Sequence, residues 1–392
     1  MRRILGVVLV ATLAPIAPVA AEAPRKGTVK IATQSPLSGE LAPLGESLRR
    51  GAQLALEKLR SPVEAAGFRV ELAPFDDQAE PHRGVANAKI IVSDPAVLMV
   101  IGHVTSGVAL PASEVYRDVG LVLISPATPD PLLTDRGLPN VNRVCGRDDV
   151  QGVVAAQFAR ETLKAKSVYI VHTKNRYGQG IAEFFEDWAK KNGMQVLGFE
   201  GTEERANFDP ILTPIQAKDP DVIFFGGEYP QAAPMFRQAR EKGIKAKFMG
   251  PDGMDSTELL KLGGDAVVGM HYTTVAGGVK EYPKAKEFAE AYKTRFGKDP
   301  EPFAAQAYDA AAIGLKALEA AIKEAGGKMP TREAVAKAVR KVKYSGITGN
   351  VEFDDKGDPK KATYLIYQVA KDWKDNQLVK RLEIAAPSMK KQ

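Results

Sequence analysis

The sequence predicts an α/β protein built from parallel sheets that are covered by helices and organised in two lobes. A unit repeats along the chain: a short β-branched apolar run, a loop rich in Gly, Pro or Ser, and a segment of helical period rich in Ala, Glu, Lys and Arg. Strands that alternate with helices form a parallel sheet with helices on its faces. Strand-like sequence also returns late in the chain, with no low-complexity linker before it. These features favour two doubly wound lobes that share the chain over two domains in series.

An export signal precedes the folded part. Residues 1–21 contain two arginines, a short uncharged apolar run and small residues that end at Ala21, which is the composition of a cleaved secretory signal peptide. The apolar run is too short for an obvious membrane span. A lipoprotein would need a cysteine directly after the signal, but the one cysteine of the chain is Cys145. We therefore expect a soluble periplasmic protein that is not a lipoprotein.

Composition excludes several classes of function. A single cysteine forms no internal disulfide, so the fold must depend on a hydrophobic core, which a chain of this length can supply. The net charge of +6 is scattered, without a basic stripe, and predicts no nucleic-acid partner. The histidines lack the close pairings of metal sites, and the Gly-Gly pairs lack phosphate-binding patterns. We expect neither a metal nor another cofactor.

The strand-like runs give the order of elements. They are, along the chain, TVKIATQS, AVLMVIG, LVLIS, SVYIV, VIFFGG and KFMG. In the helix after SVYIV, Ile181, Phe184, Phe185 and Trp188 recur at helical spacing and are predicted core residues. Two helical segments, EYPKAKEFAEAYKTRFG and PFAAQAYDAAAIGLKALEAAIKEAGG, come next. Two strands then flank a turn predicted at residues 354–359.

Hydrogen-bonding side chains collect in the loops after these strands. In open α/β sheets, ligands bind beyond the carboxyl ends of the strands. The residues there are Ser35, Thr105, Ser106, Thr128, Tyr177, Glu228, Tyr229 and Asp252. They offer groups that bind but no obvious catalyst, so we expect a binding protein, not an enzyme.

Three functions are open to Ser106. A hydrolase nucleophile elbow has glycines two residues before and two after the serine, where this chain has Val104 and Val108. A serine that only caps its own helix is the ordinary alternative. The third is a clamp for a carboxylate, because a helix N-terminus presents free N–H groups and Gly107 allows close approach.

Asp252 and Tyr177 also allow two interpretations each. Asp252 lies between Pro251 and Gly253 after a strand-like run, where it either pairs with a ligand ammonium group or serves as an ordinary turn residue. Tyr177 begins a helix, where it either covers an apolar ligand group or lies on the surface.

The motifs SPLSG, FDDQAEP, IGHVTSG, PASEVY, ISPAT, LTDRG, YGQG, FRQAREKG, FMGPDG and FDDKGD occur in an order and spacing that cover nearly the whole mature chain. In these motifs the sequence resembles the leucine/isoleucine/valine-binding protein family, the periplasmic solute-binding subunits of branched-chain amino-acid ABC importers. The resemblance implies a type I periplasmic-binding-protein fold, with two lobes joined by three crossover segments. It places lobe 1 at residues 22–147 and 276–355, and lobe 2 at residues 148–275 and 356–392.

The resemblance also implies roles for individual residues. Ser106 and the amides around it, with Thr105, would hold the ligand α-carboxylate, and Asp252 the α-ammonium. Ala127 would contribute backbone, and Tyr177 and Phe303 part of the wall around the ligand side chain. The chain also departs from the family: Pro129 stands where a threonine is common, next to Thr128, and Leu44 and Glu228 stand at positions that are often aromatic. Ala79 and Thr105 replace a cysteine pair of some members.

Glu228 bears on the identity of the ligand. It either turns to solvent or faces the cleft with Asp252, in which case the two carboxylates need a second positive charge on the ligand or a protein cation such as Arg176. The expected function is capture of an amino acid, branched-chain aliphatic first, and its delivery by a monomeric protein to a membrane permease. The alternatives are an aromatic or other carboxylate or amide as ligand, a receptor in place of the permease, and an exported serine hydrolase.

Overall fold

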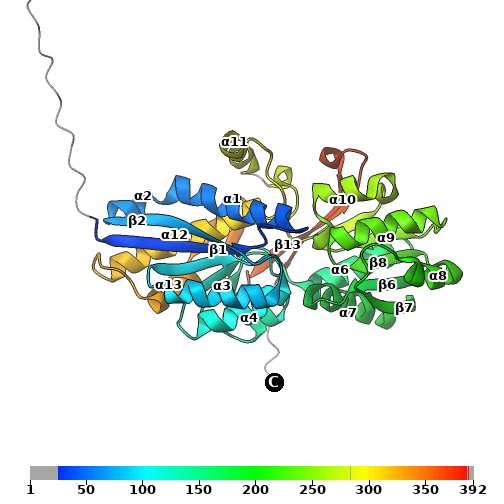
Figure 1. The fold of residues 1–392 in the computed structure, drawn as a ribbon, viewed down its shortest axis with the longest axis horizontal. Helices are drawn as coiled ribbons and strands as arrows, with labels where there is room; N and C mark the ends of the chain where they lie inside the picture. Colours follow the sequence, from blue (N-terminus) through cyan, green and yellow to red (C-terminus); the bar gives the residue numbers. More distant parts are fainter. Residues whose placement is uncertain (1–24, 283, 386, 388–392) are drawn as a thin grey trace, which may run out of the picture.

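The computed structural model describes residues 25–282, 284–385 and 387, so the predicted signal peptide lies outside the described residues. The chain forms two α/β lobes that lie side by side (Figure 1). The first lobe contains a five-stranded sheet and the second a seven-stranded sheet. The blue and cyan N-terminal elements share the first lobe with the later helices α12 and α13, while the green elements build the second (Figure 1).

The sheet of the first lobe is parallel throughout, in the order β2-β1-β3-β4-β5. Its central strands are buried on both faces, which explains their continuous apolar sequence. The strands are β1 (Gly27–Ser35), β2 (Phe68–Asp76), β3 (Val97–Gly102), β4 (Val122–Ser125) and β5 (Val141–Arg143).

Helices cover both faces of this sheet. Apolar residues of α1 (Ala42–Leu59), α12 (Ala304–Glu324) and α13 (Arg332–Lys341) form one core with the sheet. Residues of α3 (Pro81–Ser93) and α4 (Ser106–Arg117) form the core on the other face. The lobe also contains α2 (Ser61–Ala65), α5 (Leu132–Asp135) and α11 (Ala285–Phe296).

The sheet of the second lobe has the order β14-β13-β10-β9-β8-β6-β7. The first five of these strands along the chain pair in parallel, whereas β13 pairs antiparallel with β10 and β14 pairs antiparallel with β13. They are β6 (Ser167–Thr173), β7 (Gln195–Thr202), β8 (Val222–Gly226), β9 (Lys247–Gly250), β10 (His271–Thr274), β13 (Lys361–Gln368) and β14 (Gln377–Ala385).

This sheet is also covered on both faces. Residues of α6 (Asp148–Glu161) and α7 (Arg176–Lys191), Ile181 and Phe185 among the buried ones, pack on one side. Residues of α8 (Asp209–Lys218) and α9 (Tyr229–Glu241) pack on the other. The remaining helices are α10 (Thr257–Gly263) and the short 3-10 helices η1 (Asp252–Met254), η2 (Gly264–Val267), η3 (Val279–Glu281) and η4 (Trp373–Asp375).

The chain crosses between the lobes three times: after β5, after β10 and before β13. The turn predicted at residues 354–359 is present, and its first carboxylate, Asp354, accepts three backbone N–H bonds within it. The strands on its two sides belong to different sheets. β12 (Asn350–Glu352) pairs with β11 (Lys343–Ser345), whereas β13 joins β10, so the turn is a crossover.

Both lobes repeat one strand order. If the first five parallel strands of each sheet are numbered along the chain, both sheets read 2-1-3-4-5. Strand order reverses beside the first strand, and such a switch point is where doubly wound sheets bind ligands. The loops after β1 and β3 in the first lobe and after β6 and β8 in the second are therefore the expected binding edges.

Candidate functional site

A narrow cavity lies between these loops of the two lobes. Of the nine predicted ligand-binding residues, seven line it and Ser106 and Thr128 do not. The seven are Leu44, Thr105, Ala127, Tyr177, Glu228, Asp252 and Phe303, and Leu41, Val104, Pro129 and Gly253 complete the lining. Its volume is about 20 Å³, close to the space of one water molecule, so the lobes are closed onto one another here. Larger hollows of about 940 and 820 Å³ elsewhere contain none of the predicted residues.

The first lobe contributes the N-terminus of α4. Ser106 is the first residue of the helix and is fully buried, and Thr105 at the N-cap makes no side-chain cap hydrogen bond. Thr105 Oγ1 and Ser106 Oγ are buried without a hydrogen-bond partner in the described part of the chain. Buried hydroxyls are rarely left unpaired. The arrangement differs from a serine that serves only its helix, and it offers two hydroxyls and the helix N–H groups to an anion.

His103 has an acid behind it that the sequence did not reveal. Its Nδ1 lies 3.5 Å from Asp77 Oδ2, and both side chains are buried. Its Nε2 is 3.4 Å from the hydroxyl of Tyr116. Ser106 Oγ makes no hydrogen bond with this imidazole. A serine nucleophile needs its base within hydrogen-bond reach, and this geometry does not provide it.

The second lobe contributes a buried carboxylate. Asp252 is 4% exposed and lies in η1, directly after β9. Tyr177 donates its hydroxyl hydrogen to Asp252 Oδ1 at 2.7 Å and accepts the N–H of Gly253 at 2.9 Å. Burial raises the pKa of Asp252 to about 6, against the lowering effect of the Tyr177 hydrogen bond. Tyr177 therefore orients the acid in addition to lining the cavity.

Glu228 faces the cavity and is half-buried. Asn175 Nδ2 donates to both of its carboxylate oxygens at 3.1 Å. Burial raises the pKa of Glu228 to about 7. Arg176, the cation considered as its partner, turns instead to Asp130, with 2.6 Å between Nε and Oδ2.

Apolar side chains close the rest of the cavity. Leu44 and Ala127 are 3% and 2% exposed, and Phe303 is 3% exposed. Phe303 has a φ of 68°, in the left-handed region, which costs a non-glycine residue about 1–3 kcal/mol. The wall suits an aliphatic group of a ligand.

Thr128 lies outside this lining. Its hydroxyl donates to the carbonyl of His103 at 3.2 Å, and its N–H donates to Ser125 Oγ. Thr128, one of the predicted ligand-binding residues, thus supports the loop behind the cavity with its side chain. Pro129, its neighbour, is the residue that lines the cavity.

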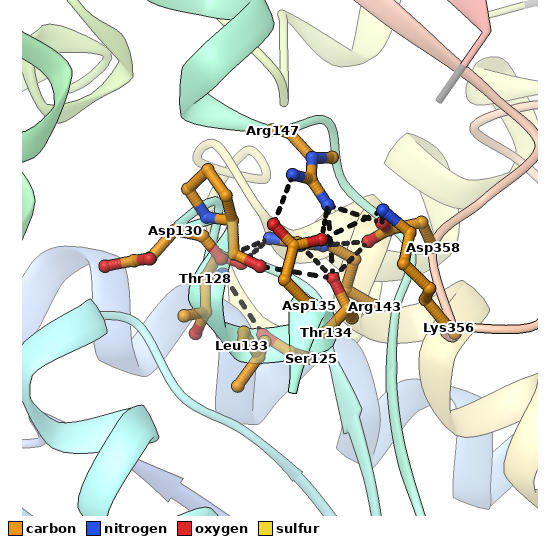
Figure 2. Close-up of polar contacts among 12 residues, drawn as sticks. Ser125, Thr128, Asp130, Leu133, Thr134, Asp135, Arg143, Arg147, Lys356 and Asp358 are labelled. Atoms are coloured by element: carbon orange, nitrogen blue, oxygen red, sulfur yellow. Dashed lines mark hydrogen bonds and ion pairs between the residues drawn. The ribbon is translucent and has the colours of Figure 1, made fainter. Parts of the chain in front are cut away.

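An ion network whose members, apart from the exposed Asp135, are buried joins the crossovers beside the site (Figure 2). Arg143 pairs with Asp358 at 2.6 Å, and Arg147 pairs with the same carboxylate and with Asp135. Lys356 completes the cluster through Asp135 at 2.9 Å. These partners come from segments more than 200 residues apart. Sequence reasoning missed them, since nothing in the local sequence distinguishes these charged residues from charged residues on the surface.

Asp148 is another residue that sequence reasoning missed. It is the first residue of α6, is 2% exposed, and its Oδ1 has no hydrogen-bond partner in the described chain. Burial, and after it the Asp252 carboxylate, raise the pKa of Asp148 well above its usual range. Asp148 and Asp149 are adjacent in the sequence, and the sequence alone does not show that Asp148 is buried while Asp149 is half-buried.

Residues 28–375 match the model of a family described as periplasmic binding protein. The leucine-, isoleucine-, valine-, threonine- and alanine-binding protein of Pseudomonas aeruginosa is 34% identical over 88% of this chain and 91% of its own. A crystal structure of the leucine-binding protein LivK from Thermotoga maritima is 30% identical, with a TM-score of 0.82 over 90% of this chain and 98% of that chain.

The substrate-binding protein LivJ of Streptococcus pneumoniae, solved in complex with isoleucine, is 25% identical, with a TM-score of 0.79 over 92% of this chain and all of that chain. The two lobes and three crossovers described above are thus the type I periplasmic-binding-protein fold. The chain belongs to the periplasmic binding protein family, among the relatives of the leucine/isoleucine/valine-binding proteins.

Proposed function

We propose that this protein captures an amino acid between its lobes and delivers it to the permease of an ABC importer. The proposal depends on one observation: an anion-binding group of the first lobe and a carboxylate of the second lobe face the same cavity. The first lobe presents the N-terminus of α4, where Thr105 lines the cavity and the buried Thr105 and Ser106 hydroxyls have no hydrogen-bond partner in the described chain, and the second presents the buried carboxylate of Asp252. An α-carboxylate and an α-ammonium on one carbon are complementary to this pair.

Closure of the lobes couples binding to transport. A ligand that bridges both lobes stabilises the closed form by its differential affinity for that form. The cavity of about 20 Å³ means that an amino acid enters with the lobes further apart, since a pocket must enclose most of its ligand's surface. The hinge would be formed by the three crossovers.

The lobe boundaries are part of this proposal. The packing of α12 and α13 on the five-stranded sheet supports residues 22–147 and 276–355 as one lobe. The pairing of β13 with β10 supports residues 148–275 and 356–392 as the other. We further propose that the protein works as an exported periplasmic monomer without catalytic activity. No helix among the described residues has the length and apolar character of a membrane span.

A thermal-shift panel tests the proposal. The mature protein is unfolded and refolded to remove carried ligand, then heated with each of the twenty amino acids, several aromatic carboxylates and short amides. A ligand that binds the folded state alone must raise the melting temperature. A shift with an amino acid supports the proposal. A shift with aromatic carboxylates or amides alone would contradict it and favour the alternative ligands, for which Pro129, without an N–H in the cavity wall, provides a rationale.

A further inference from the structure

We infer that Glu228 selects an amino acid with a cationic side chain, whose aliphatic stem lies on the apolar wall and whose terminal charge pairs with the Glu228 carboxylate. This inference rests on the proposed function. It specifies which class of amino acid the same cavity takes.

The site holds more negative charge than its protein partners balance. Asp252 and Glu228 both line the cavity, and neither makes an ion pair with any residue that the structure describes. The α-ammonium of a neutral amino acid supplies only one positive charge. Its α-carboxylate adds no positive charge and, in the proposed function, binds to the N–H groups at the N-terminus of α4. Buried carboxylates without a cation are costly, so a second positive charge on the ligand is favoured.

The neighbouring protein cations are already engaged. Arg176 pairs with Asp130, and Arg205 pairs with Glu40. Arg205 is exposed, and its charge lowers the pKa of Glu228 by less than burial raises it. The three buried cations of the crossover network are paired with Asp135, Asp149 and Asp358.

The positions of the acids distinguish their roles. Asp252 is almost fully buried and is held by Tyr177, so it suits the fixed α-ammonium. Glu228 is half-buried and belongs to the edge of the cavity, where Asn175 orients its carboxylate. A long side chain can cover apolar surface with its methylene groups and keep its charged end at such an edge. Leu41, Leu44 and Val104 provide that apolar surface.

Two ligands that differ by one ammonium group test the inference. L-Lysine and L-norleucine share the same four-carbon stem, so their affinities measured by titration calorimetry compare the terminal charge alone. We expect lysine to bind at least tenfold more tightly than norleucine to the wild-type protein. In Glu228→Gln the ratio should fall to near one, with tighter binding of norleucine than in the wild type. Glu203→Gln is the matched control, because it removes an exposed carboxylate of the same lobe and should preserve the ratio.

The outcomes separate this inference from the proposed function. If norleucine or leucine binds as tightly as lysine, or if Glu228→Gln leaves the ratio unchanged, the inference is overturned and the amino-acid function stands. If no amino acid binds at all, both are overturned.

Discussion

Arg176 and Asp130 form an ion pair across the two lobes. Arg176 begins α7 in the second lobe, and Asp130 follows β4 in the first. The guanidinium donates twice to the carboxylate, at 2.6 and 3.2 Å. Asp130 is 3% exposed, while the Arg176 side chain is half exposed. The pair therefore holds the closed arrangement at a point beside the cavity.

Removal of this pair should weaken ligand binding. Arg176→Gln leaves the buried Asp130 carboxylate without its cation, so the closed form loses stability relative to the open form. Because Arg176 is solvated, we expect a loss of about 1 kcal/mol, or about fivefold in affinity, by calorimetry. Arg205→Gln removes a cross-lobe pair that is exposed on both sides and should have a smaller effect. Equal affinities for Arg176→Gln and the wild type would show that this ion pair does not stabilise the closed form.

Asp252 should be required for binding but not for folding. Asp252→Ala removes the group that pairs with the α-ammonium, so amino-acid binding should be lost in calorimetry. The melting temperature without ligand should stay near that of the wild type, since burial already disfavours the charge of this carboxyl, whose pKa is about 6. Unchanged affinity would refute the assignment.

Ser106→Ala separates a ligand contact from a structural hydrogen bond. Ser106 Oγ has no partner in the described chain, so its loss should leave the free energy of unfolding within about 0.5 kcal/mol. Binding should weaken by less than in Asp252→Ala, because the helix N–H donors remain. Ser125→Ala is the comparison: its Oγ accepts the N–H of Thr128, and its loss should cost about 1 kcal/mol of stability. A folded Ser106→Ala protein with no binding would contradict the helix-terminus account.

The crossover network should contribute strongly to stability. Asp358 is fully buried between Arg143 and Arg147. Asp358→Asn removes the carboxylate that both guanidinium groups share. We expect the free energy of unfolding, measured in urea, to fall by about 3–5 kcal/mol. Asp187→Asn breaks an exposed pair with Lys191 and should cost less than about 0.5 kcal/mol. Similar losses of stability in the two variants would show that the network contributes no more than an exposed ion pair.

Asp255 should make stability fall as the pH rises. Burial raises its pKa to about 7, against hydrogen bonds from Thr274 and Tyr272. A carboxyl whose pKa rises on folding contributes fully below its unfolded pKa of about 3.9, and that contribution is lost as pH rises through about 7. The melting temperature of Asp255→Asn should therefore decline less than that of the wild type between pH 4 and pH 8. Parallel curves for the two proteins would contradict this.

The strands were predictable where burial on both faces requires a continuous run of apolar residues. β3, β4 and β8 are buried on both faces and stand out as apolar runs. The edge strands β2, β7 and β14 were missed because they are partly exposed and carry mixed polar residues. The short strands β5 and β10 were missed because polar residues dominate them: their sequences are VNR and HYTT.

Part of the lining of the candidate cavity was predictable because the ends of the parallel strands converge. Loops after the buried strands bring Thr105, Tyr177 and Asp252 to one cavity. Partners from distant segments could not be predicted: Arg176 meets Asp130 from a different lobe, and Asp77 meets His103 from the loop after β2. A position after a buried strand does not by itself make a residue a ligand contact: the Thr128 hydroxyl donates to the carbonyl of His103.

The interleaving of the lobes has a consequence for biosynthesis. α12, which starts at residue 304, packs against α1, β3 and β4 and supplies much of the core of the first lobe. While this helix is still unsynthesised, the N-terminal segment cannot bury Leu48 and Ile124. A nascent chain therefore stays incompletely folded until most of it has left the ribosome. Because the sequence predicts export, this delay would keep the chain unfolded, as passage through a narrow translocation channel requires.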